Sequence, residues 1–334
     1  MSTRRRINQL ALAWATAFAA TCTLATPALA QQPAAWPTKP VRVTTPFPVG
    51  SGPDAWLRIV TERLSKRWGQ PVIVENKPGG NGFIAIDAFK RGANDGHDLI
   101  QLDNVHLVAY PYLFKKLPYD PVKDFDVLQP LFRGYFFFAV PVDSKYKSVA
   151  DLIADAKARP GVLNYGSWSV GNPVHLGSAL FEAVTGTQMQ HILYKEVPML
   201  YTGVANGELN WSLGTLASTR PLFRAGKLRY LAVAAPSRLP LAPDVPSVAE
   251  AGGPAGFEAT GWTALAAPPG LPKALSDKLR ADLAAVLADP ELKDRYATFG
   301  YTAYAPTPEQ FKAFLIAESA KYADVVKRAK ASLD

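Results

Sequence analysis

The sequence predicts an α/β protein built as two lobes with a cleft between them. Strand-like runs alternate with stretches of helical periodicity along almost the whole chain, a pattern typical of α/β layers. Of the 334 residues, 48% are hydrophobic, so the chain can bury a sizeable core, and its length fits about two domains of ordinary size. The only cysteine is Cys22, which excludes disulfide frameworks, cysteine-based zinc sites and catalytic thiols.

The first set of elements repeats a strand, a loop and a helix, and this repetition predicts a mainly parallel sheet. The elements expected are a strand Val41–Thr45, a loop from Pro46 to Pro53, a helix with Leu57, Val60, Leu64 and Trp68 on its apolar face, a strand Val72–Glu75, a loop Pro78–Gly82, a helix to about Lys90, and a strand Leu99–Leu102.

A second set begins near Tyr135. We expect a first lobe of residues 31–132 plus about 236–334, and a second lobe of about 133–235. The expected elements are a strand Phe136–Val140, a helix to Ala158 opened by the capping box Ser148 and Asp151, a strand Val162–Tyr165, a helix from Asn172 to about Val184, strands Ile192–Tyr194 and Leu228–Ala234, a surface connection from Pro236 to Pro254, and a helix Leu275–Ala288. A last helix is expected to begin at Thr307 and Pro308, with Gln310 completing its capping box. Its apolar face is expected to carry Phe311, Phe314, Leu315, Tyr322, Val325 and Val326.

The first thirty residues have the pattern of a secretory signal. A basic segment, Arg4 to Arg6, precedes the largely apolar stretch from Leu10 to Ala25, and Ala28-Leu29-Ala30 forms an A-x-A end. Cleavage is expected after about Ala30, giving an exported, periplasmic protein; the alternative is an amphipathic first helix of the fold. Without those arginines the formal charge falls from +8 to +5, a mild excess that does not indicate nucleic-acid binding.

Three loops with glycines follow expected strands, at Pro46–Asp54, Pro78–Gly82 and Gly166–Gly171. Glycine lets backbone N–H groups turn toward one point, and a helix N-terminus adds partial positive charge there. The carboxyl ends of strands are also where open α/β sheets bind ligands. Together the loops predict a site for a small carboxylated ligand. The alternative for the first loop is a plain turn in which Asp54 caps the helix.

Enzyme motifs are weak. None of the four histidines belongs to an H-E-x-x-H or H-x-H motif, so no metal or other cofactor is expected. Ser169 lies in a segment similar to a hydrolase elbow, but Ser167 stands where the G-x-S-x-G turn needs glycine. Gly80, Gly82 and Ala85 only superficially match a dinucleotide fingerprint.

At these loops the sequence resembles the Bug, or tripartite tricarboxylate transporter, family of periplasmic solute-binding receptors. The similarity covers essentially the whole mature chain and follows the family's order of segments. The matching segments are 40–50 (PVRVTTPFPVG), 69–82 (GQPVIVENKPGGNG), 117–121 (LPYDP), 164–167 (NYGS) with His175-Leu176, Tyr194-Lys195, 226–233 (GKLRYLAV) and 244–252 (DVPSVAEAG).

The resemblance implies a type II periplasmic-binding-protein fold that closes over a carboxylate held by backbone groups and ordered waters. It implies no catalysis, membrane transporter subunits as partners, no nucleic acid, and by default a monomer. The ligand-binding residues expected are Pro48, Val49, Gly50, Ser51, Asp54, Gly80, Asn81, Ser167, Trp168, His175, Lys195, Glu196 and Val197. For His175 a purely structural role is the equal alternative. The alternative functions are a secreted serine hydrolase using Ser167 or Ser169 with His175, and a ligand-sensing receptor for a signalling partner.

The sequence departs from the family pattern at several of these positions. Ser51 replaces the second glycine of the first loop, and Glu196 and Val197 replace a glycine and a small residue. Gly203 stands where the family has an Asp that approaches amino or hydroxyl groups, which argues against an amino-acid ligand.

Trp168 replaces a small residue and sits in a polar loop, so it can form an aromatic wall with Tyr135, Phe136 and Trp211. We therefore expect an aromatic or other bulky carboxylate, terephthalate-like, rather than a small aliphatic diacid. The alternative is that Tyr135, Phe136 and Trp211 pack in the core.

Overall fold

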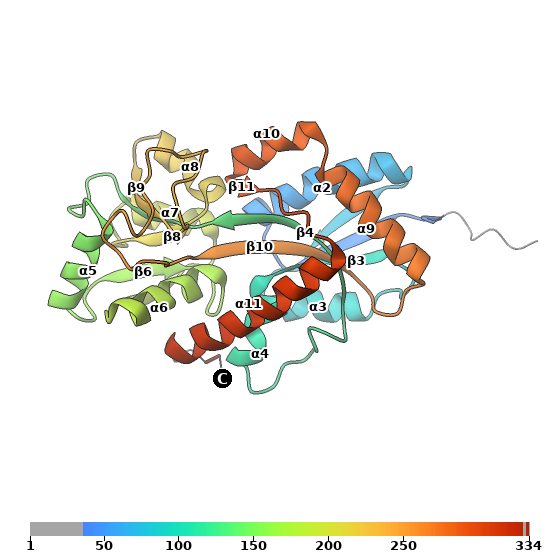
Figure 1. The fold of residues 1–334 in the computed structure, drawn as a ribbon, viewed down its shortest axis with the longest axis horizontal. Coiled ribbons are helices and arrows are strands. Elements are labelled where there is room, and N and C mark those ends of the chain that lie inside the picture. Colours follow the sequence, from blue (N-terminus) through green and yellow to red (C-terminus); the bar gives the residue numbers. More distant parts are fainter. Residues whose placement is uncertain (1–35, 330–331, 334) are drawn as a thin grey trace, which may run out of the picture. The chain divides into compact units, whose positions relative to one another are not determined.

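The computed structural model describes residues 36–329 and 332–333, so the expected signal segment and Cys22 lie outside the described residues. One compact unit begins at Lys39, and the three described residues before it belong to a separate unit. All elements discussed below lie in the compact unit, which has two α/β lobes (Figure 1).

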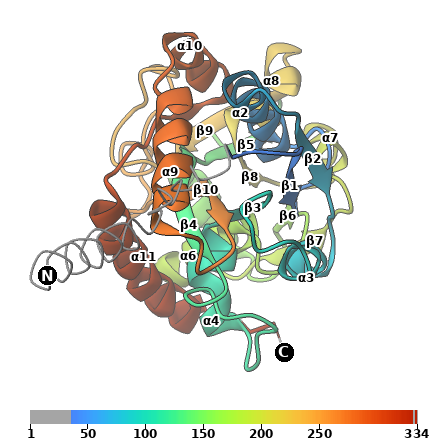
Figure 2. The same cartoon turned by 90° about the vertical axis from the view of Figure 1, so that its right-hand side faces the viewer.

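The first lobe contains a six-stranded sheet with the order β11-β4-β10-β3-β1-β2. Helices α2 and α9 cover one face of this sheet, and α3, α4 and α11 cover the other (Figures 1 and 2). The strands are β1 Val41–Thr45, β2 Val72–Asn76, β3 Asp98–Asp103, β4 Asp126–Tyr135, β10 Thr260–Ala267 and β11 Tyr301–Thr302. The helices are α2 Gly52–Trp68, η1 Gly80–Gly82, α3 Phe83–Lys90, η2 Val105–Ala109, α4 Tyr110–Leu113, α9 Lys273–Leu287, α10 Pro290–Phe299 and α11 Pro308–Ala329.

The second lobe contains a three-stranded sheet, β8-β5-β9, and a two-stranded sheet, β6-β7. Its strands are β5 Phe137–Pro141, β6 Asn164–Ser167, β7 Gln190–Leu193, β8 Ser212–Gly214 and β9 Leu228–Val233. Its helices are α5 Val149–Ala158, α6 Pro173–Thr185, α7 Val197–Ala205 and α8 Leu216–Arg224.

The chain passes between the lobes along extended segments that hydrogen-bond to one another. The Phe136 N–H donates to the Ala259 carbonyl at 3.1 Å, the Ala259 N–H to the Ala234 carbonyl at 3.2 Å, and the Ala234 N–H to the Phe136 carbonyl at 2.8 Å. Each residue sits just outside a strand, so the crossing is a short three-stranded bridge of backbone (Figure 1).

Parallel pairing is confirmed for the three strands from which it was predicted, β1, β2 and β3, but the six-stranded sheet as a whole is mixed and not mainly parallel. Strands β1 and β2, β1 and β3, and β6 and β7 pair in parallel, but β10 is antiparallel to β3 and β4, β11 to β4, and β5 to β8 and β9. The antiparallel part arises because β10 returns from the second lobe and inserts between β3 and β4. Hydrophobic periodicity does not reveal the direction in which a strand re-enters a sheet.

The predicted helix starts are largely confirmed. Ser148 and Asp151 form the expected capping box of α5, and Asn172 caps α6. Thr307 and Gln310 exchange reciprocal hydrogen bonds at the start of α11. The expected apolar face of α2 is buried, as are Phe311, Tyr322 and Val326 on α11, whereas the side chain of Val325 is not described. The residue that caps α2 is Ser51 and not Asp54.

Candidate functional site

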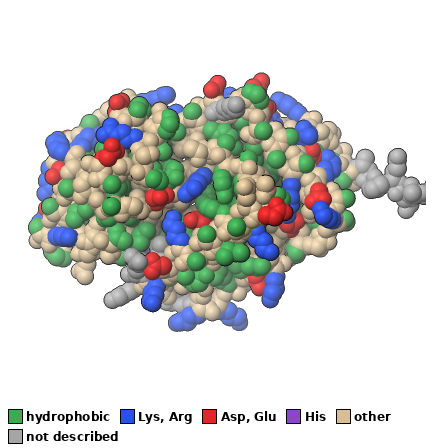
Figure 3. Space-filling model, in the orientation of Figure 1, with side chains coloured by type: hydrophobic (Ala, Val, Ile, Leu, Met, Phe, Trp, Pro, Cys, Tyr) green, Lys and Arg blue, Asp and Glu red, His purple; other side chains and the backbone are tan. Residues whose placement is uncertain are grey.

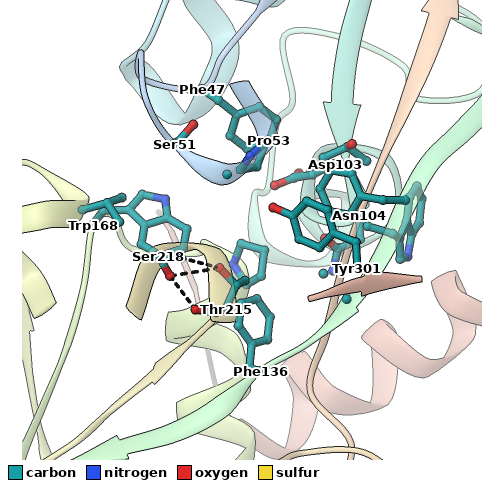
Figure 4. A pocket seen from close by; sticks show the side chains of 18 of the residues that line it. Phe47, Ser51, Pro53, Asp103, Asn104, Phe136, Trp168, Thr215, Ser218 and Tyr301 are labelled. Atoms are coloured by element: carbon teal, nitrogen blue, oxygen red, sulfur yellow. Dashed lines mark hydrogen bonds between the residues drawn. The ribbon is translucent and has the colours of Figure 1, made fainter. Parts of the chain in front are cut away.

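A pocket opens between the two lobes, and we call it the main pocket (Figure 4). The first lobe lines it with the loop after β1, the end of β3 and parts of β4, β10 and β11; the second lobe contributes the loop after β6 and the starts of α7 and α8. Two pockets adjoin it. The side pocket is lined by the loop Pro78–Gly82 and Lys195, and the outer pocket by the segment Pro48–Gly52 and Pro198.

The parallel strands determine which loops meet at this site. Because β1, β2 and β3 are parallel neighbours, the segments that follow Thr45, Asn76 and Asp103 emerge at one edge of the first-lobe sheet. Strands β6 and β7 likewise bring together the segments after Ser167 and Leu193. The predicted arrangement of loops at carboxyl ends of strands is therefore present in both lobes.

The first loop is held by its own hydrogen bonds. Gly50, at φ +77°, donates its N–H to Asp54 Oδ2 at 2.8 Å, and the Ser51 N–H donates to the Pro48 carbonyl at 3.2 Å. These two amides are thus occupied within the loop. Among the described residues, no acceptor is found for the amides of Val49 and Gly52, and the Gly52 amide is the first of the 17-residue helix α2. The loop therefore presents two free N–H groups at a helix N-terminus, a favourable place for an anion.

Gly52 also accommodates a side chain from the far end of the chain. A Cβ at this position would lie 2.4 Å from the hydroxyl oxygen of Tyr301, so only glycine fits without displacing that ring. Tyr301 lines the main pocket and stacks on Phe132 with a ring-centroid separation of 3.7 Å.

Asp54 lies behind the loop and not in the pockets. Its side chain is 2% exposed, and its carboxylate accepts the Gly50 amide, the Asn76 Nδ2–H at 2.7 Å and a charged contact from Arg58 at 3.1 Å. With its oxygens engaged in this way, Asp54 positions the loop and leaves contact with a ligand to its neighbours.

The other predicted residues of the first lobe border the side pocket. Gly80 and Asn81 line it, and Asn81 is a non-glycine residue at φ +54°. Gly82 faces His106, whose Nε2 would lie 2.1 Å from a Cβ at that position.

In the second lobe, Ser167 and His175 belong to a buried network. Ser167 is fully buried; its Oγ donates to the Ser169 carbonyl at 3.0 Å and lies 2.7 Å from Nε2 of His191. His175 accepts the Gly171 N–H at Nδ1, and its ring lies 4.2 Å from that of His191. Burial lowers the pKa of His175 to about 4, with a smaller contribution from His191. This geometry fits the structural interpretation of His175, and Ser167 pairs with a different histidine from the one expected for a hydrolase.

Trp168 borders both the main and the side pocket, and Figure 4 shows its ring across the main pocket from Asp103, Asn104 and Tyr301. Phe136 also lines the main pocket. Trp211 does not: it is fully buried and stacks on Phe138 at 5.1 Å. Tyr135 lies under the Arg133 guanidinium. For Trp211 the core-packing alternative holds.

The segment after β7 lines three pockets. Val197 borders all of them, Lys195 the side pocket and Glu196 the outer pocket. Glu196 is the residue before α7, where its side chain makes no capping hydrogen bond.

Sequence reasoning missed several residues that line the main pocket, namely Phe47, Gly52, Asp103, Asn104, Thr215, Ser218 and Tyr301. For Asp103 and Asn104 a signal existed, because they directly follow the predicted strand Leu99–Leu102. The same carboxyl-end rule that selected the first loop selects them. Thr215 and Ser218 hydrogen-bond each other at 2.9 Å at the start of α8.

Within the described part of the chain, no cluster of three or more His, Cys, Asp or Glu side chains is placed to hold a metal ion. None of the described helices is both long enough and apolar enough to cross a membrane.

Two α/β lobes with a pocket between them define the class of periplasmic binding proteins. The chain belongs to the tripartite tricarboxylate transporter family receptors (TctC), whose family model matches residues 56–330. It is 32% identical to a UPF0065 protein of Bordetella bronchiseptica over 81% of this chain and 80% of that protein. It is 29% identical to BugT of Bordetella pertussis over 95% of this chain and 96% of that one.

Solved structures support the same assignment. A Rhodopseudomonas palustris protein with adipate is 30% identical, with a TM-score of 0.83, covering 89% of this chain and 99% of that one. MatC from Rhodopseudomonas palustris, with bound malate, is 27% identical, with a TM-score of 0.78, covering 87% of this chain and 100% of that one.

Proposed function

We propose that this chain is a periplasmic receptor that binds an organic carboxylate between its lobes and presents it to the subunits of a membrane transporter. The observation that carries the proposal is the main pocket itself, which has contributions from both lobes. Near the N-terminus of α2, the amides of Gly52, which lines this pocket, and of Val49, which lines the adjoining outer pocket, have no acceptor among the described residues. Preorganised N–H groups at a helix N-terminus stabilise a carboxylate without a cationic side chain. Similar proteins carry adipate and malate, both carboxylates.

The sequence placed the second lobe at about 133–235. We propose instead that it spans about 136–259, because the bridge lies at Phe136, Ala234 and Ala259 and because Val248, Ala251 and Phe257 pack in the second-lobe core; the rest of the mature chain forms the first lobe. Ligand binding shifts the balance between open and closed arrangements of the lobes, since a ligand that contacts both lobes is bound best when they are close. The proposed mature chain begins after about Ala30 and acts as a monomer in the periplasm. It binds no nucleic acid, consistent with the interspersed acidic and basic side chains on the face in Figure 3.

We further propose that the ligand-binding residues are those at the pocket rims: Pro48, Val49, Gly50, Ser51, Gly80, Asn81, Trp168, Lys195, Glu196 and Val197. Asp54, Ser167 and His175 act behind them by holding the loops. The aromatic lining from Phe47, Phe136 and Trp168 favours an aromatic or other bulky carboxylate over a small diacid.

The test is a thermal-shift and calorimetric screen of aliphatic and aromatic carboxylates, each paired with the carboxamide of the same carbon skeleton. A ligand at 100 times its Kd adds about 2.7 kcal/mol of stability, so a true ligand gives a clear shift. We expect at least one carboxylate to bind with its carboxamide much weaker. If every carboxylate fails to bind a folded protein, the proposal is wrong.

The same proposal holds that the chain is not a serine hydrolase. Ser167 is buried and its hydroxyl donates to a carbonyl, so it is poorly placed as a nucleophile. Incubation with ester substrates is expected to give no product release that Ser167→Ala or Ser169→Ala abolishes. Serine-dependent release would favour the hydrolase.

A further inference from the structure

One wall of the main pocket carries polar atoms that lack protein partners. Asn104 is fully buried and Tyr301 is 2% exposed. Neither the Asn104 Oδ1 atom nor the Tyr301 hydroxyl has a hydrogen-bond partner among the described residues. Both side chains line the pocket, beside Asp103 (Figure 4). Buried polar atoms are normally satisfied, and because both side chains line the pocket, a group bound there can become their partner once these side chains shift to admit it.

The orientation of the Asn104 amide follows from its neighbours. Its nitrogen, Nδ2, lies 3.4 Å from the Thr260 carbonyl oxygen and also contacts the Tyr322 hydroxyl. A carbonyl oxygen can only accept, so the amide nitrogen must face it. The unpaired atom is therefore the amide oxygen, an acceptor.

Asp103 presents a second acceptor. The Asp103 side chain is 7% exposed, and its Oδ1 receives the amides of Val105 and His106 at 3.1 and 3.2 Å and lies 2.5 Å from the His106 Nδ1. These contacts fix the carboxylate in place. No donor among the described residues reaches the other oxygen, Oδ2.

The charged side chains that line the main pocket also favour a ligand with a hydrogen-bond donor at this end. Asp103 is the only charged side chain among the described residues that line it, and no Lys or Arg does so. The rest of the lining is largely apolar, an environment in which charges interact strongly. A second carboxylate bound in the main pocket would meet the Asp103 carboxylate with no Lys or Arg of that pocket to offset the repulsion; Lys195 lines the adjoining side pocket.

We propose that the ligand carries, at the end opposite its carboxylate, a hydrogen-bond donor that Asp103 and Asn104 bind, with an ammonium group favoured over a neutral donor. This inference rests on the proposed function and narrows it to ω-amino carboxylates or their close relatives. Gly203 lacks the acidic side chain that the family resemblance would lead one to expect for an amino group. Asp103 supplies an acid from the other lobe, at the carboxyl end of β3.

The test compares acids of one length by calorimetry at neutral pH. The aliphatic set is hexanoate, adipate and 6-aminohexanoate; the aromatic set is 4-methylbenzoate, terephthalate and 4-(aminomethyl)benzoate. In the wild-type protein we expect the amino acid of at least one set to bind at least tenfold more tightly than the diacid of that set. In Asp103→Asn, which keeps an acceptor for the two backbone amides, that advantage should fall by at least tenfold.

Asp143→Asn is the matched control, because Asp143 is exposed in a turn of the second lobe and its loss changes the net charge equally. It should leave the wild-type order of affinities unchanged. Diacids that bind the wild type as tightly as the amino acids of both sets overturn this inference while leaving the proposed function intact. Failure of every acid in both sets and in the wider carboxylate screen overturns the proposed function as well. If Asp103→Asn does not fold, the wild-type series alone decides.

Discussion

Trp168 is the residue through which the bulk of the ligand can be tested. It borders two pockets and packs partly against the cores of the second lobe. Replacing it with alanine should weaken an aromatic carboxylate by about 1–3 kcal/mol, because a stacked ring loses its apolar and quadrupolar contacts. Calorimetry checks this, with Trp168→Phe as the variant that retains a ring. If the alanine variant is folded by circular dichroism and its affinity is unchanged, Trp168 does not stack on the ligand.

Tyr301 and Tyr296 form a matched pair for testing buried hydroxyl groups. Both rings pack against Trp56, but the Tyr296 hydroxyl donates to the Leu131 carbonyl at 3.0 Å whereas the Tyr301 hydroxyl has no partner among the described residues. Burial of an unpaired hydroxyl is costly, while a paired one contributes about 1 kcal/mol.

We therefore expect Tyr301→Phe to leave the free energy of unfolding of the ligand-free protein unchanged or higher, and Tyr296→Phe to lower it by about 0.5–1.5 kcal/mol. Urea unfolding of the two variants measures both values. A loss of stability in Tyr301→Phe as large as that in Tyr296→Phe would show that the Tyr301 hydroxyl has a stabilising partner of its own.

Among the elements, the starts of α2 and α5 allow stability to be separated from binding. Ser51 caps α2 and lines the main pocket, whereas Ser148 caps α5 in an exposed capping box away from the pockets. Loss of an N-cap side chain costs about 0.5–2 kcal/mol. Both Ser51→Ala and Ser148→Ala should lower the free energy of unfolding, but only Ser51→Ala should also weaken the carboxylate. Equal affinities in the two variants would exclude the Ser51 side chain from the binding site.

The elements that the sequence could predict are those with strong local signals. The capping residues Ser148, Asn172 and Thr307, and the apolar face of α2, identify their helices without tertiary information. Strands β4 and β10 were missed because their pairing partners are distant in sequence: Thr260 lies opposite Tyr135, for example. Tyr301 was missed in the site for the same reason, since nothing near it in the sequence places its hydroxyl against Gly52.

At the scale of the whole molecule, the bridge at Phe136, Ala234 and Ala259 links the lobes by backbone hydrogen bonds, and α11 of the first lobe also packs against α6 of the second. Such a bridge suits a hinge, because a few residues at the ends of strands can absorb the change in backbone angles. The amides of the first loop and the Trp168 loop lie on opposite sides of that hinge, so a ligand bound by both favours closure.

Closure can be measured as energy transfer between two fluorophores attached to introduced cysteines. The expected mature chain has no cysteine of its own to compete for the label, because Cys22 precedes the expected cleavage site. Ile73 on β2 and Leu193 on β7 belong to different lobes and are 50% and 56% exposed. Neither residue lines any of the three pockets described. The substitutions Ile73→Cys and Leu193→Cys therefore give one label on each lobe. A saturating ligand should change the energy transfer between them. The pair Ile73→Cys and Ile316→Cys lies within the first lobe, with Ile316 65% exposed on α11, and its transfer should stay constant. If calorimetry detects binding while the transfer between lobes is as constant as that within one lobe, the ligand binds without closure and the hinge is not used.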